Sequence, residues 1–427
     1  MGKKIPAEVW YPLDNAAMVY SAIQRDDYSA VYRFSAVMDE QVDPEALQRA
    51  VNRVMPRFPG FQVRLRPGVF WYYFDGDPTF LPQVEPDIAN PCQPVRFSAQ
   101  DRLLRVFYYE KRISIELFHA MADGSGALAF LKTLIGEYLR QKGIEVPCAM
   151  GVLDPELPPE PGEWEDAYAR YATSRVKRGT KGSLAFRQKG IPEPFYTLNI
   201  TMGIMKVDAL KAAAKKYGAT ITEYLAAGLI QSLLALQHGQ DLARERPVAL
   251  VVPIDLRHFF PSPTMRNFIL TARVAIDPEL GEYAFEELVE IVRHSLRLQM
   301  TRQELQARIT QNVALQKSPI LRWVPRPLKN RAIALGFWLS GERPYSTTFT
   351  NPGVFKVPES MQEHIQRIEV VLGQSYRGPA NCAAISCGET FTFSFSGTLK
   401  ECDLERLFFR WLVREGVPVK VISNRKE

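Results

Sequence analysis

The chain has 427 residues, of which 46% are hydrophobic, so it can bury a large core and by its length should form at least two structural lobes. Its net charge of +6 is small for this length and most of its cations are interspersed with acids, which disfavours a nucleic-acid-binding protein. No apolar run has the length of a membrane helix and residues 1–10 lack the features of a signal peptide, so we expect a cytoplasmic protein.

The five cysteines are sparse and odd in number, and none belongs to a CxxC unit. This pattern disfavours both a disulfide framework and a zinc site, and it fits a reducing compartment. Cys382 and Cys387 lie in apolar, strand-like sequence, where we expect small buried side chains. We therefore assign no metal to the site that is predicted below.

The first part of the chain alternates between strand and helix patterns. Residues 28–38 are expected to form a strand, and residues 43–55 a helix that Asp43 caps at its start. Two strands should follow in residues 61–74 around a Pro-Gly turn, and a hairpin in residues 102–118. This succession of elements indicates a sheet with a helix packed on it.

A long helix and a proline-rich connection come next. From Asp123 to about residue 142 apolar residues recur at helical spacing, which predicts an amphipathic helix. Residues 143–195 contain seven prolines and are typical of a connection between lobes. We predict an N-terminal lobe over residues 1–178 and a C-terminal lobe over residues 179–427.

The second half repeats the mixture of strands and helices. Runs of adjacent strands indicate mixed sheets covered by helices, and thus a two-lobed α/β fold. Strands are expected in residues 196–207, 246–256, 268–276, 345–355, 367–373, 382–388 and 390–397. Helices are expected in residues 208–218, 220–239 and 402–416, with two helical stretches between about residues 283 and 340.

The segment FHAMADGSG, residues 118–126, joins the expected hairpin to the long helix. His119 ends the strand and Asp123 opens the helix, so a short turn separates the two residues. Neutral imidazole, with a pKa of about 6.5, can take a proton from a hydroxyl or amine near pH 7, which contributes roughly 10²- to 10⁴-fold in rate. A short turn can fix the ring in one tautomer and orientation, and Gly124 relaxes the steric constraint there.

Asp123 has three roles open to it. Its carboxylate could orient the imidazole of His119 directly, brace the turn against a distant cation, or cap the helix, and the sequence alone does not separate these roles. The plain alternative for His119 is a histidine at a strand end without a catalytic role. The spacing H-x-x-x-D-G is what makes the catalytic hypothesis worth pursuing.

The HxxxDG pattern resembles the signature of the chloramphenicol acetyltransferase-like superfamily of CoA-dependent acyltransferases, which includes peptide-synthetase condensation domains and alcohol acetyltransferases. Its place after a strand-helix-strand unit, at a strand-to-helix junction in the first third of the chain, is also similar. Three further segments resemble the alcohol acetyltransferase and condensation-like branch, so the resemblance extends from residue 10 to about residue 415. They are residues 10–20, 252–268 and 348–361.

The resemblance implies an active-site tunnel between two similar lobes, with His119 as the general base. Acyl-CoA would be the co-substrate, no cofactor would be bound permanently, and a small alcohol or amine would be the acceptor. Asp123 and Gly124 would be structural, with Asp123 paired to Arg257 across the lobes and not to His119. A guanidinium fork suits this pairing better than a lysine does.

A tetrahedral intermediate needs a hydrogen-bond donor for its oxyanion. Thr348, Thr350 and Asn351 carry suitable groups for the oxyanion or for substrate. Threonine is also ordinary in a strand, and asparagine before Pro-Gly is ordinary in a turn. Their role is therefore left open by the sequence.

Two other functions stay open beside acyl transfer from CoA. Condensation domains usually have two adjacent histidines here, and Phe118 stands where the first of them would be, which weakens the peptide-synthetase assignment without affecting the catalytic one. The donor could nevertheless be carried by a carrier protein. The chain could also be a binding protein that has this fold and no activity.

Two stretches contain cations and no acid: residues 167–191 with seven cations, and residues 305–341 with six. Such stretches are usually solvated faces, and the alternative is a positive rim for CoA phosphates or for an anionic surface. The apolar and basic helix expected within residues 318–341 indicates a hydrophobic acceptor or peripheral contact with a membrane, although such helices more often face a core.

Overall fold

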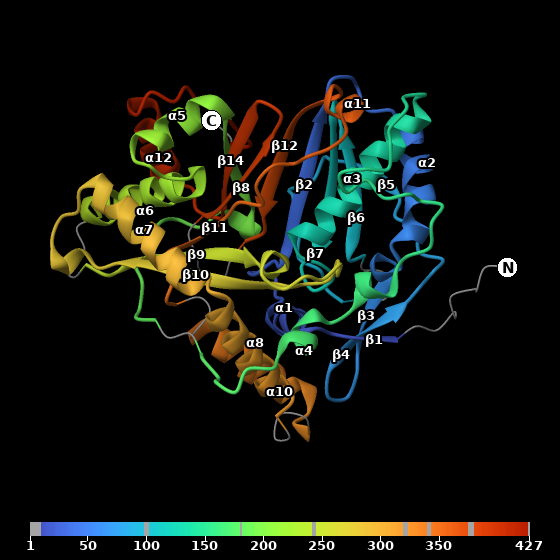
Figure 1. Ribbon diagram of the computed structural model, residues 1–427, viewed down its shortest axis with the longest axis horizontal. Helices are drawn as coiled ribbons and strands as arrows, with labels where there is room; N and C mark the ends of the chain where they lie inside the picture. Colours follow the sequence, from blue (N-terminus) through green and yellow to red (C-terminus); the bar gives the residue numbers. More distant parts are fainter. Residues whose placement is uncertain are drawn as a thin grey trace.

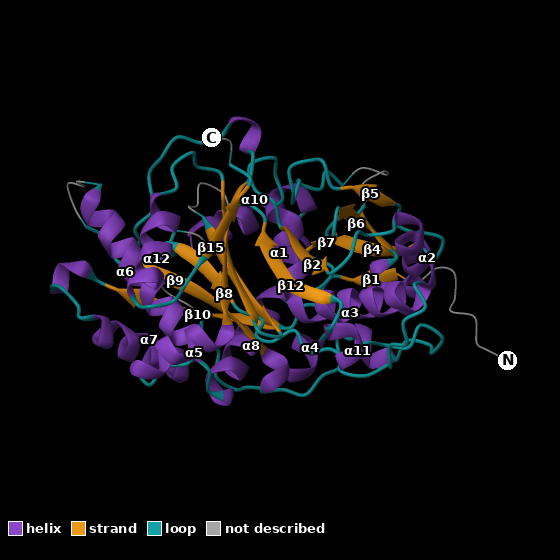
Figure 2. Ribbon diagram, turned by 90° about the horizontal axis from the view of Figure 1, so that it is seen from above, coloured by secondary structure: helices purple, strands orange, loops and turns teal. Residues whose placement is uncertain are grey.

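The computed structural model describes residues 10–97, 102–179, 182–240, 245–318, 323–339, 343–374 and 380–425. Within these ranges the chain forms three sheets and their covering helices, arranged in two halves (Figure 1). Figure 2 shows that the larger sheets approach each other in the middle of the molecule, with helices around them. This is the two-lobed α/β arrangement that the sequence predicts.

A five-stranded sheet and a three-stranded sheet form the first half. Asp43 caps helix α2 (Pro44–Val54) as expected, and its carboxylate accepts from Glu45 N at 2.9 Å. Helix α3 (Gly124–Gln141) packs against α2 over the larger sheet. The larger sheet has the order β12 (Ile365–Leu372), β2 (Val31–Met38), β7 (Arg112–Phe118), β6 (Leu104–Tyr109), β5 (Val84–Pro86), and the smaller one β1 (Trp10–Pro12), β4 (Tyr72–Gly76), β3 (Val63–Pro67).

A seven-stranded mixed sheet forms the second half. β11 runs parallel to both of its neighbours, and the remaining pairs are antiparallel, so the prediction of a mixed sheet is confirmed. The order is β10 (Ile269–Ile276), β9 (Val248–Asp255), β11 (Thr347–Thr350), β13 (Asn381–Cys387), β14 (Thr390–Gly397), β8 (Asn199–Lys206), β15 (Lys420–Ser423).

The region between residues 283 and 340 differs from the expectation of two helices. Its described part contains three α-helices. The first ends at Met300, and Thr301 caps the next one because its side chain accepts a hydrogen bond from Glu304 N. These are α7 (Phe285–Gln299), α8 (Arg302–Gln316) and α10 (Arg326–Phe337). The other helices are α1 (Asn15–Ile23), α4 (Ala167–Tyr171), α5 (Val207–Lys216), α6 (Ile221–Gly239), α11 (Glu359–Gln362) and α12 (Asp403–Arg414).

The two large sheets are joined by hydroxyl groups along β14. Its sequence alternates hydroxyl and phenylalanine side chains, and the phenylalanines are buried in the core of the second half. The hydroxyls face β12 and donate to its backbone carbonyls: Thr392 to Ile368 (2.8 Å), Ser394 to Val370, and Ser396 to Leu372 (2.7 Å). Because β12 pairs with β2, the C-terminal part of the chain completes a sheet of the first half. The division near residue 178 stays a prediction.

Within the described ranges, no single helix has both the length and the apolar composition of a membrane span, and α5 and α6, which are bent by 75° relative to each other, meet both conditions only when they are taken as a pair. Cys382 and Cys387 are buried in β13, as expected of small apolar side chains. Residues 319–322 and 340–341 of the apolar and basic stretch lie outside the described residues.

Candidate active site

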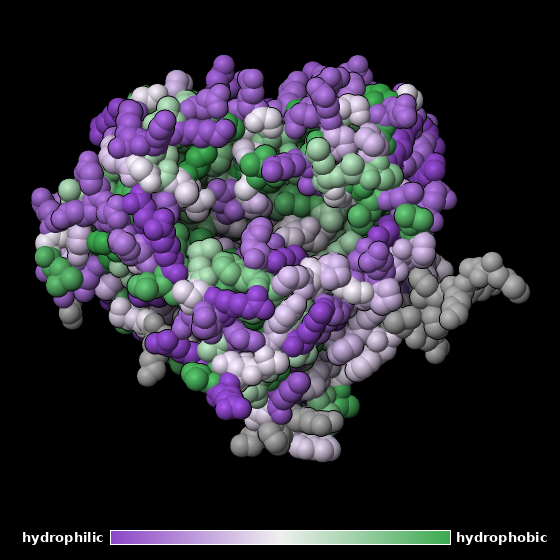
Figure 3. All heavy atoms as spheres, viewed as in Figure 1, coloured by the Kyte–Doolittle hydropathy of each residue, from purple (hydrophilic) through white to green (hydrophobic). Residues whose placement is uncertain are grey.

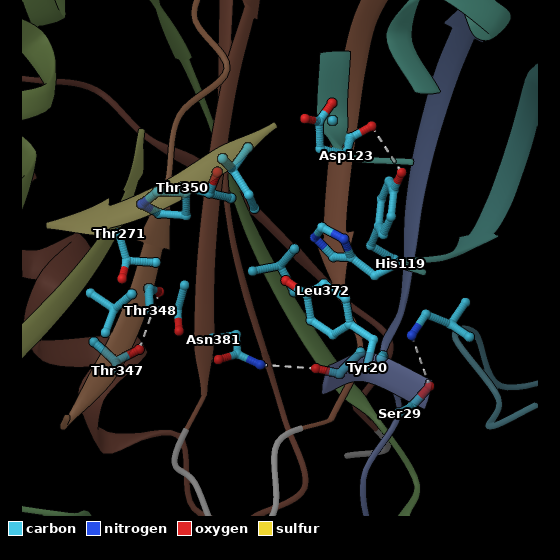
Figure 4. A pocket seen from close by; sticks show the side chains of 18 of the residues that line it. Tyr20, Ser29, His119, Asp123, Thr271, Thr347, Thr348, Thr350, Leu372 and Asn381 are labelled. Atoms are coloured by element: carbon cyan, nitrogen blue, oxygen red, sulfur yellow. Dashed lines mark hydrogen bonds between the residues drawn. The ribbon is translucent and has the colours of Figure 1, made fainter. Parts of the chain in front are cut away.

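A cavity of about 470 Å³ lies between the two halves, and His119 lines it. Its lining comes from both halves, including β2 and the turn after β7 on one side and β9, β10 and β11 on the other. Figure 4 shows the imidazole of His119 projecting from one wall, with Thr348 and Thr350 on the opposite wall. The ring is partly exposed, so a substrate in the cavity can reach it.

Two tyrosines hold the plane of the imidazole. The ring of Tyr20 stacks on that of His119 with 4.3 Å between centroids, and the ring of Tyr32 lies tilted at 4.8 Å. The Tyr32 hydroxyl also donates to the backbone carbonyls of Ala122 (2.9 Å) and Asp123 (3.1 Å). One side chain therefore supports both the ring and the turn that carries it.

An asparagine from the second half sets the tautomer of the ring. His119 Nδ1 lies 3.1 Å from Asn267 Oδ1. The amide nitrogen of Asn267 faces two acceptors instead, the carbonyl of Ala120 at 3.3 Å and Asp14 Oδ2 at 3.5 Å. Since the amide oxygen is thereby directed to the ring, Nδ1 carries the proton and donates it, and Nε2 keeps its lone pair.

The protonation state of His119 follows from its surroundings. Burial lowers its pKa from the ordinary value of 6.5, against the opposing effects of a hydrogen bond with its own backbone, the charge of Asp123 and the bond with Asn267. The neutral ring therefore predominates at pH 7. A neutral imidazole with a free Nε2 is a proton acceptor, as a general base requires.

Asp123 uses both carboxylate oxygens for structure. Its Oδ1 accepts from Ser125 N (3.1 Å) and Gly126 N (3.3 Å), which caps α3. Its Oδ2 accepts from Arg257 Nη1 (2.8 Å) and Phe268 N (2.8 Å) in the second half. The pairing with Arg257 that the resemblance implies is present, and Asp123 serves as helix cap at the same time.

Arg257 is held by a set of acceptors that matches its planar fork. Its Nε and Nη2 donate to the carbonyl of Thr264 at 2.9 and 2.8 Å, and Nη2 also donates to the carbonyl of Arg266 at 2.7 Å. Nη1 bridges Asp123 and Asp255. Burial lowers the pKa of Arg257, but the two carboxylates raise it by more than burial lowers it. The pKa is therefore above its ordinary value and the guanidinium stays charged.

The position that requires glycine for steric reasons is Gly126 and not Gly124. Gly124 lines the cavity, its φ is outside the left-handed region, and a Cβ there would meet only Phe34 Cζ, at an ordinary 3.7 Å. A Cβ on Gly126 would lie 2.0 Å from the backbone oxygen of Met265. Gly126 is the position where the two halves approach too closely for a side chain.

The predicted oxyanion candidates separate into two groups. Thr348 and Thr350 line the cavity. The amide of Asn351 is occupied in its turn, because Oδ1 accepts from Gly353 N at 3.0 Å and Nδ2 donates to Thr222 Oγ1 at 3.0 Å. The threonines therefore face the space where substrate can bind, whereas the geometry gives Asn351 a turn-forming function.

Sequence reasoning missed Tyr20, Tyr32 and Asn267, which shape the surroundings of His119. A signal for Asn267 exists, because this buried asparagine stands directly before an alternating strand in the segment that also holds Arg257. Arg187, from the acid-free stretch 167–191, lines the cavity. In the described ranges no group of three or more His, Cys, Asp or Glu residues is arranged to hold a metal ion.

Neither a family model nor a curated protein sequence matches the chain, whereas its fold matches solved structures over nearly its whole length. Polyketide synthase associated protein 5 from Mycobacterium tuberculosis is 16% identical, with a TM-score of 0.65 over 96% of this chain and 98% of that one. TRI3 trichothecene 15-O-acetyltransferase from Fusarium sporotrichioides is 12% identical, with a TM-score of 0.60 over 97% and 96%. The condensation domain of the Monacolin K polyketide synthase MokA is 12% identical, with a TM-score of 0.58 over 95% of this chain and 96% of that one. The chain thus has the two-lobed fold of condensation domains and of the TRI3 acetyltransferase. This is the chloramphenicol acetyltransferase-like fold that the resemblance of its HxxxDG motif implies.

Proposed function

We propose that the protein transfers an acyl group from acyl-CoA to a hydroxyl or amine acceptor. The observation that carries this proposal is a neutral imidazole, fixed by Tyr20, Tyr32 and Asn267, beside a cavity lined by both halves. Nε2 of His119 takes the proton of the acceptor as its oxygen or nitrogen attacks the thioester carbonyl. The tetrahedral intermediate then expels the CoA thiolate, which receives the proton from the imidazolium.

Thr348 and Thr350 are the proposed contacts for the oxyanion or for substrate. Their place on the wall opposite His119 supports this role, because the reacting carbonyl must lie between the base and the oxyanion donor. Neither a metal nor a covalent enzyme intermediate is needed for this reaction.

Arg187 is the proposed contact for the phosphates of CoA among the cations of residues 167–191, because it lines the cavity. Arg178 instead pairs with Glu304 at the surface, 2.9 Å away. Tyr20, Tyr28 and Phe337 in the lining favour a small hydrophobic acceptor. The proposed location is the cytoplasm, where acyl-CoA is available.

A second candidate function is condensation with a donor that is bound to a carrier protein. The likeness to the MokA condensation domain favours it, and the same base would serve. Comparing turnover of acyl-CoA with turnover of an acylated carrier protein separates the two donors. A native chain without transfer from either donor would instead support a binding protein of the same fold.

The decisive experiment measures release of free CoA thiol from a panel of acyl-CoA donors, with alcohols and amines as acceptors. His119→Ala should lower turnover at least about a hundredfold, because general-base help is lost. His294→Ala is the matched control, since His294 is exposed on α7, where it pairs with Glu290. Unchanged turnover in a folded His119→Ala protein would contradict the mechanism.

A further inference from the structure

The outer face of helix α10 is apolar and open to solvent. Leu328 and Leu335 lie on α10 and Leu339 in the π-helical residues that continue it, at intervals of seven and four residues, so they form one stripe. Their exposed fractions are 58%, 55% and 48%. Ala332, between them on the same face, is also exposed. A helix at the edge of a globular protein normally has polar residues on its outer side, so burial in a core does not explain this apolar stripe.

The inner face of α10 is firmly attached to the protein. Lys329 is buried, donates to the carbonyl of Phe70 at 2.9 Å, and lies 3.3 Å from the ring centroid of Trp71. Phe337 lines the catalytic cavity, and α10 packs on α1. Because the inner face is already used in this way, α10 cannot turn its leucines inward without losing these contacts.

The tip of the β3–β4 hairpin extends the apolar stripe. Val69 at the tip is 74% exposed and Trp323, just before α10, is 71% exposed. The two segments are in contact, since Arg326 N donates to the carbonyl of Val69 at 3.0 Å and the rings of Phe70 and Trp323 meet edge to face at 5.8 Å. Figure 1 shows both at the lower end of the molecule, and in Figure 3 this end carries apolar side chains beside hydrophilic ones. We name this surface the apolar end: it comprises Val69, Trp323, Leu328, Leu335 and Leu339.

The charged residues of α10 are all cations: Arg326, Lys329 and Arg331. Residues 305–341 contain no acid. Of the cations on α10, Arg331 is exposed beside the leucine stripe and Arg326 is partly exposed. Two copies of this surface would bring like charges together, which disfavours a second copy of the chain as its partner. An anionic bilayer has both an apolar acyl-chain region for the leucines and negatively charged headgroups for the cations.

We propose that the apolar end binds to the surface of an anionic lipid bilayer. The leucines and Trp323 enter the boundary between headgroups and acyl chains, and Arg331 and Arg326 contact the phosphates. α10 then lies in the plane of the interface, with Phe337 and the catalytic cavity directly behind it. This binding does not depend on acyl transfer, so it can be tested whether or not the proposed function is correct.

The test is co-sedimentation of the full chain with phosphatidylcholine vesicles that either contain or lack phosphatidylserine. We expect binding to the anionic vesicles that weakens with added salt. The triple variant Leu328→Gln, Leu335→Gln, Leu339→Gln should bind at least about tenfold more weakly. The matched control is Leu157→Gln with Leu280→Gln, two leucines that are 60% and 81% exposed outside the apolar end. Because all of these side chains are exposed, the variants should keep the native melting temperature.

A second measurement does not depend on the triple variant. The emission of Trp323 is obtained by subtracting the fluorescence spectrum of Trp323→Phe from that of the native chain. This emission should shift to shorter wavelength when anionic vesicles are added. Absence of binding to both vesicles would overturn the proposal, as would equal binding by the triple variant. A concentration-dependent dimer that the triple variant abolishes, without vesicle binding, would identify the surface as an interface between copies and would also overturn it.

Discussion

Nδ1 of His119 and Oδ1 of Asn267 lie 3.1 Å apart, although 148 residues separate them in the sequence. The histidine belongs to the turn after β7 and the asparagine to the segment before β10, so each half of the molecule supplies one partner of the bond. The state of the proposed base therefore depends on how the halves are assembled. We call Asn267 a positioning residue, because it acts on His119 and not on substrate.

Asn267→Ala should lower kcat roughly ten- to a hundredfold, with a smaller effect on the KM of either substrate, because one hydrogen bond to the imidazolium-forming ring is lost. The bond with Asn267 raises the pKa of His119, so its loss should move the acid limb of the pH–rate profile to lower pH. Steady-state kinetics across pH checks both effects. Asn330→Ala, on the inner side of α10, is the control, and an unshifted acid limb would argue for a purely structural role.

If the proposed function is correct, the native protein should keep its activity at pH values below the ordinary pKa of histidine. Burial lowers the pKa of His119 from 6.5, and only the neutral ring accepts a proton, so kcat/KM should fall only as pH drops through a value below 6.5. The profile should be measured with an alcohol acceptor, which does not titrate in this range. An acid limb above neutral pH would contradict the assignment of His119.

Asp14 should make the stability of the protein depend on pH. Burial raises the pKa of Asp14 to about 6, against the charge of Arg266 and the bond from Ala17 N. At pH values between the pKa of Asp14 in the unfolded chain and its pKa in the folded chain, the carboxyl is protonated in the native state and ionised in the unfolded state. The free energy of unfolding should therefore fall as pH rises towards 6, by roughly 2 to 3 kcal/mol. Asp14→Asn retains the cap of α1 and should flatten this slope. Urea unfolding of both proteins across the acid range measures it, and parallel curves would contradict the prediction.

Gly126→Ala should destabilise the protein by about 1 to 3 kcal/mol, because its Cβ would lie 2.0 Å from the backbone oxygen of Met265. Gly124→Ala is the matched substitution, where the added Cβ makes an ordinary 3.7 Å contact with Phe34. It should change stability by less than about 0.5 kcal/mol. Thermal unfolding of the two variants compares them directly, and equal losses would show that the close approach of the halves is not what requires glycine.

Asp123→Ala should cost on the order of 3 to 5 kcal/mol, because it removes the cap of α3 and one carboxylate from the buried Arg257. Asp123→Asn should cost less, since an amide oxygen can still cap the helix. Chemical unfolding measures the difference between them. If the two variants were equally unstable, the charge of Asp123 and not its capping bonds would dominate.

The features that the sequence predicts well are those encoded locally. Asp43 caps its helix as expected, Asp123 takes the capping role that was one of three left open for it, and the HxxxDG spacing by itself singles out His119 among the five histidines. Contacts between distant segments carry no such local pattern. β12 looks like any apolar strand, and nothing near it indicates that it pairs with β2. The bond from Asn267 and the clash at Gly126 likewise exist only once the two halves meet.

The position of β12 also bears on how the chain acquires its native fold. β2, the second strand of the five-stranded sheet, is bordered on one side by β7 and on the other by residues 365–372, which the ribosome makes last among the strands of that sheet. Until then one side of β2 has unpaired amide and carbonyl groups. The N-terminal sheet therefore cannot be completed vectorially during synthesis, and its last strand is added only when most of the polypeptide has been translated.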